Sequence, residues 1–147
     1  MPKEIKEEFK WFVAGFTAGE GSFYSYPYKT KNRRQKAVSI AFEIKLNIAD
    51  SDILFKIKDM FDCGHIYFAE HTTQKGLVCK SVSYSIRDKQ DLNNKIIPFF
   101  DKYNMFNSKK QISYLKWKQC MKLVIDKKHL TEEGFELLKQ LSKKINK

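Results

Sequence analysis

The residues best placed to do chemistry are one acid, Glu20, and the small residues that precede it. On a helix, small side chains four residues apart leave a groove in which a second backbone can approach closely. The candidates for such a contact are Ala14, Gly15, Ala18 and Gly19. If two copies of this helix paired about a two-fold axis, their Glu20 carboxylates would lie side by side, an arrangement that a divalent cation stabilises. The alternative is an ordinary helix end with an exposed acid.

The elements that must position Glu20 follow from the spacing of apolar residues along the chain. The predicted elements are a helix over 5–18, strands over 22–26 and 38–46, a helix from 51 to 63, strands over 65–69 and 81–86, and helices over 92–100, 109–126 and 132–145. Two antiparallel hairpins with helices between them predict one four-stranded sheet that is covered on one face. The predicted fold class is therefore α+β, in a single domain over 1–147.

The chain is strongly basic, with 28 Lys and Arg against 17 Asp and Glu in 147 residues and a net charge of +11. Such an excess repels itself in a compact fold and is typical of proteins that bind a polyanion. Most of these cations are lysines, which suit phosphate contacts more than bidentate recognition of bases. Five cations fall in the loop between the first two strands, where we expect contacts to nucleic-acid phosphates: Lys29, Lys31, Arg33, Arg34 and Lys36.

The uncovered face of the predicted sheet is polar, and a polar face bounded by cations suits nucleic-acid binding. Strand alternation places on it Ser22, Tyr24, Tyr26, Tyr28, Ser39, Ala41, Glu43, Lys45, Tyr67, Ala69, His71, Ser81 and Ser83. In a major groove, Glu43 would accept from cytosine N4 and Lys45 would reach guanine. The alternative is a face that is polar only because water covers it.

Several other classes of protein are excluded. No run of 18 apolar residues that could span a membrane exists, and the N-terminus has neither a signal core nor a presequence pattern. Cys63, Cys79 and Cys120 are odd in number and far apart, as expected of reduced thiols in an intracellular protein. A zinc site of Cys63, His65, His71 and Cys79 would lack any C-x-x-C pair, so ordinary buried or surface roles are favoured.

The segment Val13-Ala14-Gly15-Phe16-Thr17-Ala18-Gly19-Glu20-Gly21 resembles the LAGLIDADG homing-endonuclease signature, and Ser22-Phe23 follow it as is common in that family. The resemblance continues in order over 9–147. Its further segments are Asp52-Ile53-Leu54, Gly64-His65-Ile66-Tyr67, Ile97-Pro98-Phe99-Phe100-Asp101, Ser108-Lys109-Lys110, Trp117 and His129-Leu130-Thr131-Glu132-Glu133-Gly134. With one copy of the motif, the chain resembles the single-motif, homodimeric type.

This resemblance implies an αββαββα fold with a saddle-shaped four-stranded antiparallel sheet, followed here by extra C-terminal helices. It implies a homodimer whose motif helices pack together and whose sheets lie in the major groove of double-stranded DNA. Glu20 would bind Mg²⁺ or Mn²⁺, assisted by the carbonyl of Gly19, and the metal would activate water and stabilise the leaving 3′ oxygen. The implied activity is intron homing, in which both strands of a long near-palindromic site are cut.

Three positions depart from the family pattern or leave a choice open. Ala18 stands where the family has the first acid of its motif, and that acid is not the metal ligand. Asn47 ends the second strand, where some relatives carry a glutamine that holds water near the metal. An active-site lysine is expected at the start of the helix over 109–126, and either Lys109 or Lys110 matches it. For both lysines, phosphate contact or solubility is the alternative role.

Two other functions stay open from the sequence. One is a maturase-like splicing helper that binds the host intron RNA without cleaving DNA, and the other is a DNA-binding half of a longer, two-motif protein. A start at Met1 just before the motif helix and an end at Lys147 favour a complete chain. Richness in Lys, Ile, Phe and Asn fits the AT-rich genome of a mitochondrion or chloroplast, and synthesis there would need no targeting peptide.

Overall fold

A computed structural model of the protein describes residues 4–32 and 35–145. Its chain forms an antiparallel four-stranded sheet and flanking helices, so the predicted α+β class is confirmed. The elements are α1 (Glu7–Glu20), β1 (Gly21–Lys29), β2 (Lys36–Asn47), η1 (Ile48–Asp50), α2 (Ser51–Phe61), β3 (His65–Thr72), β4 (Val78–Ile86), α3 (Lys89–Asp91), η2 (Leu92–Ile96), α4 (Ile97–Lys102), α5 (Lys109–Ile125), η3 (Lys128–Leu130) and α6 (Glu132–Ile145).

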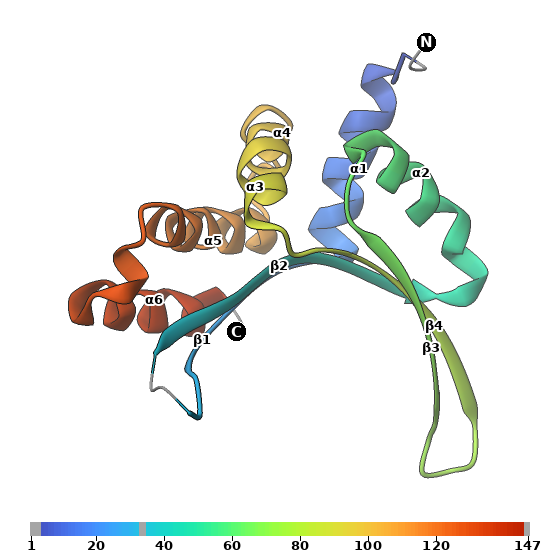
Figure 1. Ribbon diagram of the computed structural model, residues 1–147. Helices are drawn as coiled ribbons and strands as arrows, with labels where there is room; N and C mark the ends of the chain where they lie inside the picture. Colours follow the sequence, from blue (N-terminus) through green and yellow to red (C-terminus); the bar gives the residue numbers. More distant parts are fainter. Residues whose placement is uncertain (1–3, 33–34, 146–147) are drawn as a thin grey trace.

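The sheet has the strand order β1-β2-β4-β3, so two hairpins meet at the central strands β2 and β4. Figure 1 shows the sheet arched like a saddle, with the helices gathered on its convex side and the β3–β4 hairpin reaching past them. There, α5 and α6 lie over the β1–β2 hairpin, while α1 and α2 lie over the other end of the arch. Among the described residues, no helix is long and apolar enough to cross a membrane.

The core lies between the sheet and the helices, and aromatic rings dominate its centre. Phe23 on β1 has four ring neighbours with centroids 5.2–5.4 Å from its own, namely Phe42, Phe100, Tyr114 and Trp117. The indole N–H of Trp117 in α5 donates to the backbone carbonyl of Tyr24 at 3.0 Å. Trp117 therefore both fills the core and fixes the backbone of the strand that continues from Glu20.

The C-terminal helix α6 is attached to the first hairpin by polar contacts. Near its start, the ammonium of Lys36 on β2 donates to the carboxylate of Glu132 at 2.7 Å. Towards its end, the buried hydroxyls of Ser25 and Ser142 lie 2.8 Å apart. Thr131 caps the helix as predicted, because its hydroxyl accepts a backbone N–H from the first turn at 3.0 Å. These contacts hold the extra C-terminal helices against the back of β1.

Three strands and one helix differ most from their predicted extents. β4 begins at Val78, three residues before its predicted start. β1 continues through Pro27 to Lys29, which is possible because an edge strand tolerates proline. β3 continues to Thr72, and its outer part is exposed on both faces, so no apolar alternation marks it in the sequence. The helix predicted over 92–100 is broken into short segments with a π turn before α4, because Pro98 lacks the N–H that would continue the hydrogen-bond ladder.

Trp117→Ala is expected to lower the free energy of unfolding by about 3–5 kcal/mol, because it opens a cavity beside Phe23 and removes the donor to Tyr24. Trp117→Phe should lower it by about 1–3 kcal/mol, since the ring stays but the carbonyl loses its partner. Urea unfolding followed by circular dichroism measures both. Trp11→Phe is the matched control, because Trp11 is 43% exposed; an equal loss in this control would contradict the role given to Trp117.

Candidate active site

Glu20 is the last residue of α1, and its side chain is exposed. The C-terminal end of a helix carries partial negative charge from carbonyls that lack a helical partner, which disfavours an acid there. The last turn of α1 contains no basic residue to offset this charge. The electrostatics of this helix end therefore favour the binding of a cation.

Lys110 reaches the same helix end from α5. Its ammonium donates to the backbone carbonyl of Gly21, the residue that follows Glu20. Lys109 is exposed, because one position along a helix turns the side chain by about 100°. Ser108 fixes the start of α5, since its hydroxyl accepts a backbone N–H of the first turn at 3.2 Å. The structure thus distinguishes two lysines that the sequence left equivalent and places Lys110 at the Glu20–Gly21 junction.

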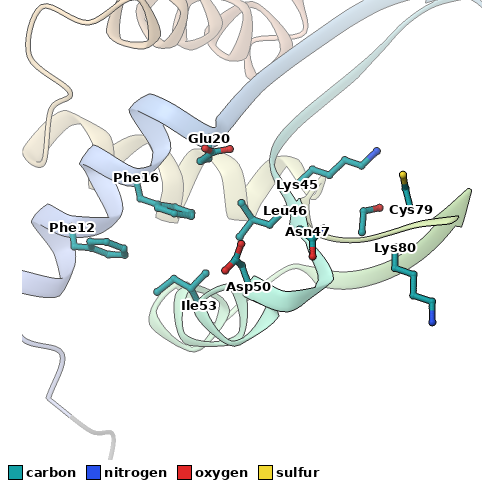
Figure 2. Close-up of a pocket in the computed structure, with 11 residues that line it drawn as sticks. Phe12, Phe16, Glu20, Lys45, Leu46, Asn47, Asp50, Ile53, Cys79 and Lys80 are labelled. Carbon is teal, nitrogen blue, oxygen red and sulfur yellow. The ribbon is translucent and has the colours of Figure 1, made fainter. Parts of the chain in front are cut away.

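A groove of about 710 Å³ opens beside Glu20. One wall is formed by Phe12, Phe16 and Glu20, which follow each other at four-residue spacing along α1. Figure 2 shows that the facing wall comes from the end of β2, the turn η1 after it, the start of α2, and β4. The residues of that wall are Lys45, Leu46, Asn47, Asp50, Ile53, Cys79, Lys80 and Ser81. Acid, amide and lysine side chains from three parts of the chain therefore border one open space.

Asn47 lies in this groove, but half of its side-chain amide is already used. Its Oδ1 accepts from the backbone N–H of Ala49 at 3.0 Å, so the NH₂ group is what it can offer to a water. Asp50 is a second carboxylate in the groove, and sequence reasoning did not place it there. It stands at the N-cap of α2 without a side-chain capping bond. Its place directly after the strand that ends at Asn47 was the signal that could have found it.

The oxygen ligands at the end of α1 fit a hard divalent cation such as Mg²⁺. Glu20 offers a carboxylate, and Gly19 offers a backbone carbonyl in the last turn. Within 4–32 and 35–145, no three His, Cys, Asp or Glu side chains come together around one point. A site of this kind suits Mg²⁺, which proteins bind through one or two carboxylates while water and substrate phosphates supply the other ligands.

The four residues considered for zinc lie in two places. His71 is opposite Cys79 across the β3–β4 hairpin, whereas His65 is opposite Ser85 at the other end of β3. Burial raises the pKa of the Cys63 thiol above its ordinary value, which disfavours the thiolate form that binds zinc. These side chains therefore share no common metal site.

A stripe of glycines lies open on α1 beside the groove. A Cβ placed on Gly15 or Gly19 would meet no described atom within 4 Å. Each glycine in a helix interior costs about 1 kcal/mol relative to alanine, and packing within this chain does not require either one. Ala18 is half-buried. The prediction that Ala14 belongs to the contact face is wrong, because Ala14 has no exposed surface and lies in the chain's own core.

The strand register brings the predicted polar residues onto the side of the sheet that faces away from the helices. Ser22, Tyr24 and Tyr26 lie opposite Glu43, Ala41 and Ser39, and Lys45 lies opposite Ser83, which lies opposite Tyr67. Tyr26, Tyr28 and Tyr67 are 56%, 42% and 54% exposed. Two predictions are corrected on this face. Ala41 has no exposed surface, and Ser81 is buried together with its hydroxyl, so neither side chain can contact a ligand.

Two predicted contact residues already have partners inside the chain. The carboxylate of Glu43 accepts from the guanidinium of Arg87 at 2.6 Å and from the hydroxyl of Ser85 at 3.1 Å, so it is not an open acceptor for cytosine. The ammonium of Lys36 is bound to Glu132, and only 17% of its side chain is exposed. This contact holds the pKa of the Glu132 carboxyl below its ordinary value. Lys36 is therefore removed from the expected phosphate contacts.

The remaining cations of the first hairpin divide into two groups. Lys29 and Lys31 are exposed at the end of β1, while Arg33 and Arg34 lie outside the described residues. Sequence reasoning did not place Arg87 near the sheet face, because it comes one residue after β4 ends. The alternation that puts Ser81 and Ser83 on this face, carried four residues further, reaches Arg87 and was the available signal.

Lys110→Met is expected to lower the free energy of unfolding by about 1–3 kcal/mol, because the carbonyl of Gly21 loses its charged donor. Lys109→Met makes the same chemical change one position away, where the side chain is exposed, and should alter stability by less than about 0.5 kcal/mol. Urea unfolding of the two variants measures the difference. Equal stabilities of the two variants would contradict the placement of Lys110 at the junction.

Three curated relatives match most of this chain. The probable intron-encoded endonucleases 3 and 2 of Neurospora crassa are 30% identical over 131 residues and 34% identical over 128 residues, which cover 89% and 85% of the chain. The uncharacterized mitochondrial protein RF1 of Saccharomyces cerevisiae is 32% identical over 118 residues, or 80% of the chain. The match covers only 23%, 26% and 22% of the three relatives, so the chain spans about a quarter of their length.

Solved structures share the fold, and the expected αββαββα saddle is confirmed. The I-LtrWI LAGLIDADG homing endonuclease bound to target DNA superimposes with a TM-score of 0.79 at 26% identity, over 96% of this chain and 45% of its own. I-SmaMI, bound to uncleaved DNA target in the presence of calcium ions, gives a TM-score of 0.80 at 25% identity, over 99% and 47%. The family described as LAGLIDADG endonuclease matches residues 13–121, which is more than half of the chain and includes Glu20. The protein belongs to the LAGLIDADG endonuclease family.

Proposed function

We propose that this chain is a site-specific endonuclease of intron homing, which cuts both strands of a long near-palindromic DNA as a homodimer with a divalent metal. The observation that carries the proposal is the position of Glu20, which ends the helix with the open glycines and directly precedes the strand that starts the polar sheet face. An acid at that position can act on DNA held by the sheet. Similarity to two chains whose structures contain target DNA supports DNA as the substrate.

The homodimer is supported by the surface of α1 and by the length of the relatives. Gly15 and Gly19 leave room for a second backbone, and the neighbouring large apolar side chains of Trp11 and Phe12 are 43% and 47% exposed, so they could pack against a second copy. The chain spans just under half of the DNA-bound relatives, which supports two such units acting on one target. Two identical units related by a two-fold axis would recognise a near-palindrome.

The residues around Glu20 have separate roles in this proposal. Glu20 and the carbonyl of Gly19 would hold Mg²⁺ or Mn²⁺, which would supply an activated water and charge stabilisation for the leaving 3′ oxygen. Lys110 donates one of its N–H groups to Gly21 and keeps two others, with which it neutralises charge on the cleaved phosphate. Asn47 donates from its NH₂ group to a water in the groove.

DNA binding and cellular location follow from the same placement. The polar sheet face lies in the major groove, with Ser22, Tyr24, Tyr26, Tyr28, Ser39, Lys45, Tyr67, Ala69, His71 and Ser83 toward the bases and Lys29 and Lys31 toward phosphates. We place the protein in an organelle, where local synthesis needs no targeting peptide. The description of one relative as a mitochondrial protein supports this location.

Glu20→Gln is expected to reduce cleavage of the target at least 100-fold, on the order expected for loss of a charged metal ligand, while DNA affinity stays within about threefold. The substitution keeps the size of the side chain and leaves the lysines that contact phosphates in place. Selection of cut sites from a randomised duplex library with Mg²⁺ supplies the substrate, and gel assays then measure cleavage and binding.

Glu136→Gln, an exposed acid on α6, is the matched control and should cleave at the wild-type rate. Cleavage by Glu20→Gln at that rate would refute the assignment of Glu20. If the folded wild-type dimer cuts no sequence in the library with Mg²⁺, the endonuclease proposal fails, and binding of intron RNA by the same protein tests the splicing-helper alternative.

Gly15→Leu is expected to convert the dimer to a monomer at micromolar concentration, because the new side chain fills the space that a second helix backbone needs. Sedimentation velocity measures the mass. Gln140→Leu adds the same side chain to an exposed position of α6 and should leave the dimer intact. A monomeric wild type, or an unchanged dimer in the Gly15 variant, would contradict this interface, and a monomeric wild type would favour a unit that pairs within a longer protein.

A further inference from the structure

Arg87 lies across the middle of the polar sheet face. It follows β4, and its guanidinium contacts two residues of the neighbouring strand β2, Glu43 at 2.6 Å and Ser39 at 3.4 Å. Ser39 and Glu43 stand on either side of Ala41 on the same face, so the guanidinium spans that position. Ala41 has no exposed surface, which is consistent with this cover.

The contacts of Arg87 fix its orientation without using up its donors. The carboxylate of Glu43 is itself held by the hydroxyl of Ser85 at 3.1 Å, so the acceptor cannot swing away. Two of the five N–H groups of the guanidinium are directed to Glu43 and Ser39, which leaves three. The Arg87 side chain is still 56% exposed, against 35% for Glu43. The arginine is therefore the member of the pair that a ligand on this face meets.

The local charge argues against a simple phosphate contact. Arg87 and Glu43 form a neutral pair, so their position attracts a polyanion less than the exposed lysines Lys29, Lys31 and Lys45 do. A planar guanidinium held in one orientation is instead suited to directional recognition by two parallel N–H donors. In the major groove, the base edge that accepts two such bonds is guanine, through O6 and N7.

We infer that Arg87 reads a guanine in each half of the DNA target and that Glu43 positions it, instead of contacting a base itself. The inference rests on the proposed function, because it requires DNA on the polar sheet face. On this inference, Arg87 contacts the DNA base, and the contact of Glu43 with cytosine that the sequence suggested does not form. Ser85 belongs to the same device, since it holds the carboxylate that orients the arginine.

The test selects DNA duplexes that the protein binds, whether or not it cleaves them, from a randomised library. The readout is the DNA that the protein retains in the absence of divalent metal. The wild type is expected to enrich guanine at one position of each half-site. Arg87→Lys keeps the charge but loses the paired donors, so its preference for that guanine should fall about 10- to 100-fold while all other positions keep theirs. Glu43→Gln should weaken the same preference to a smaller extent, because an amide still accepts from the guanidinium.

Lys31→Ala is the control for a phosphate contact, and it should weaken binding to every sequence alike and lower the salt slope by about 1. The same uniform loss in Arg87→Lys, or an unchanged guanine preference, would overturn the inference alone. A wild type that enriches no sequence would overturn the proposed function together with it. An Arg87-dependent guanine in a protein that binds but does not cut would uphold the inference and refute only the endonuclease proposal.

Discussion

The direct junction between α1 and β1 is the constraint on which the rest of the structure depends. The helix ends at Glu20 and the strand begins at Gly21, so no loop lies between them that could adjust their relative positions. A Cβ on Gly21 would lie 2.5 Å from Cγ2 and 2.9 Å from the carbonyl oxygen of Thr17, so the strand can leave the helix this closely only from glycine. Lys110 and Trp117 then bind the next backbone carbonyls from α5. Any movement of α5 is therefore transmitted to both the acid and the sheet face.

On the proposed function, different charged residues of the chain would attract DNA and recognise its sequence. The net charge of +11 comes mainly from lysines, which act at long range and independently of sequence. Near the centre of the polar sheet face, Glu43 neutralises the charge of Arg87, the one arginine among the described residues. The remaining N–H donors of Arg87 can form directional hydrogen bonds, although the pair carries no net charge. Lys36 is likewise engaged with the protein itself, where it attaches α6 to β2. A count of cations thus overstates how many act on a partner.

Features that follow from the alternation of side chains along a strand can be predicted from the sequence. Features that depend on the orientation of a single helical residue cannot. Alternation with a period of two is unaffected by small errors in strand ends, so the sheet face from Ser22 to Ser83 follows from it. A helix turns by about 100° per residue, so the equal spacing of Ala14–Ala18 and Gly15–Gly19 cannot tell which pair faces the core, nor which of Lys109 and Lys110 reaches Gly21. Glu43 contacts Ser85 on β4 and Arg87 just after that strand. No local sequence pattern predicts such contacts between residues more than 40 positions apart.

The open side of α1 links assembly to chemistry. Gly15, in the interior of α1, costs the helix about 1 kcal/mol of stability relative to alanine, and packing inside the chain does not require it. The same helix ends in an acid at its negative pole, with no third ligand close enough to hold a metal among the described residues. Both features are unfavourable in an isolated unit. In the proposed homodimer, a second helix would cover the glycines, and DNA phosphates would complete the coordination of a cation at Glu20. On this proposal, one unit would stay inactive until it has both a partner and a bound target.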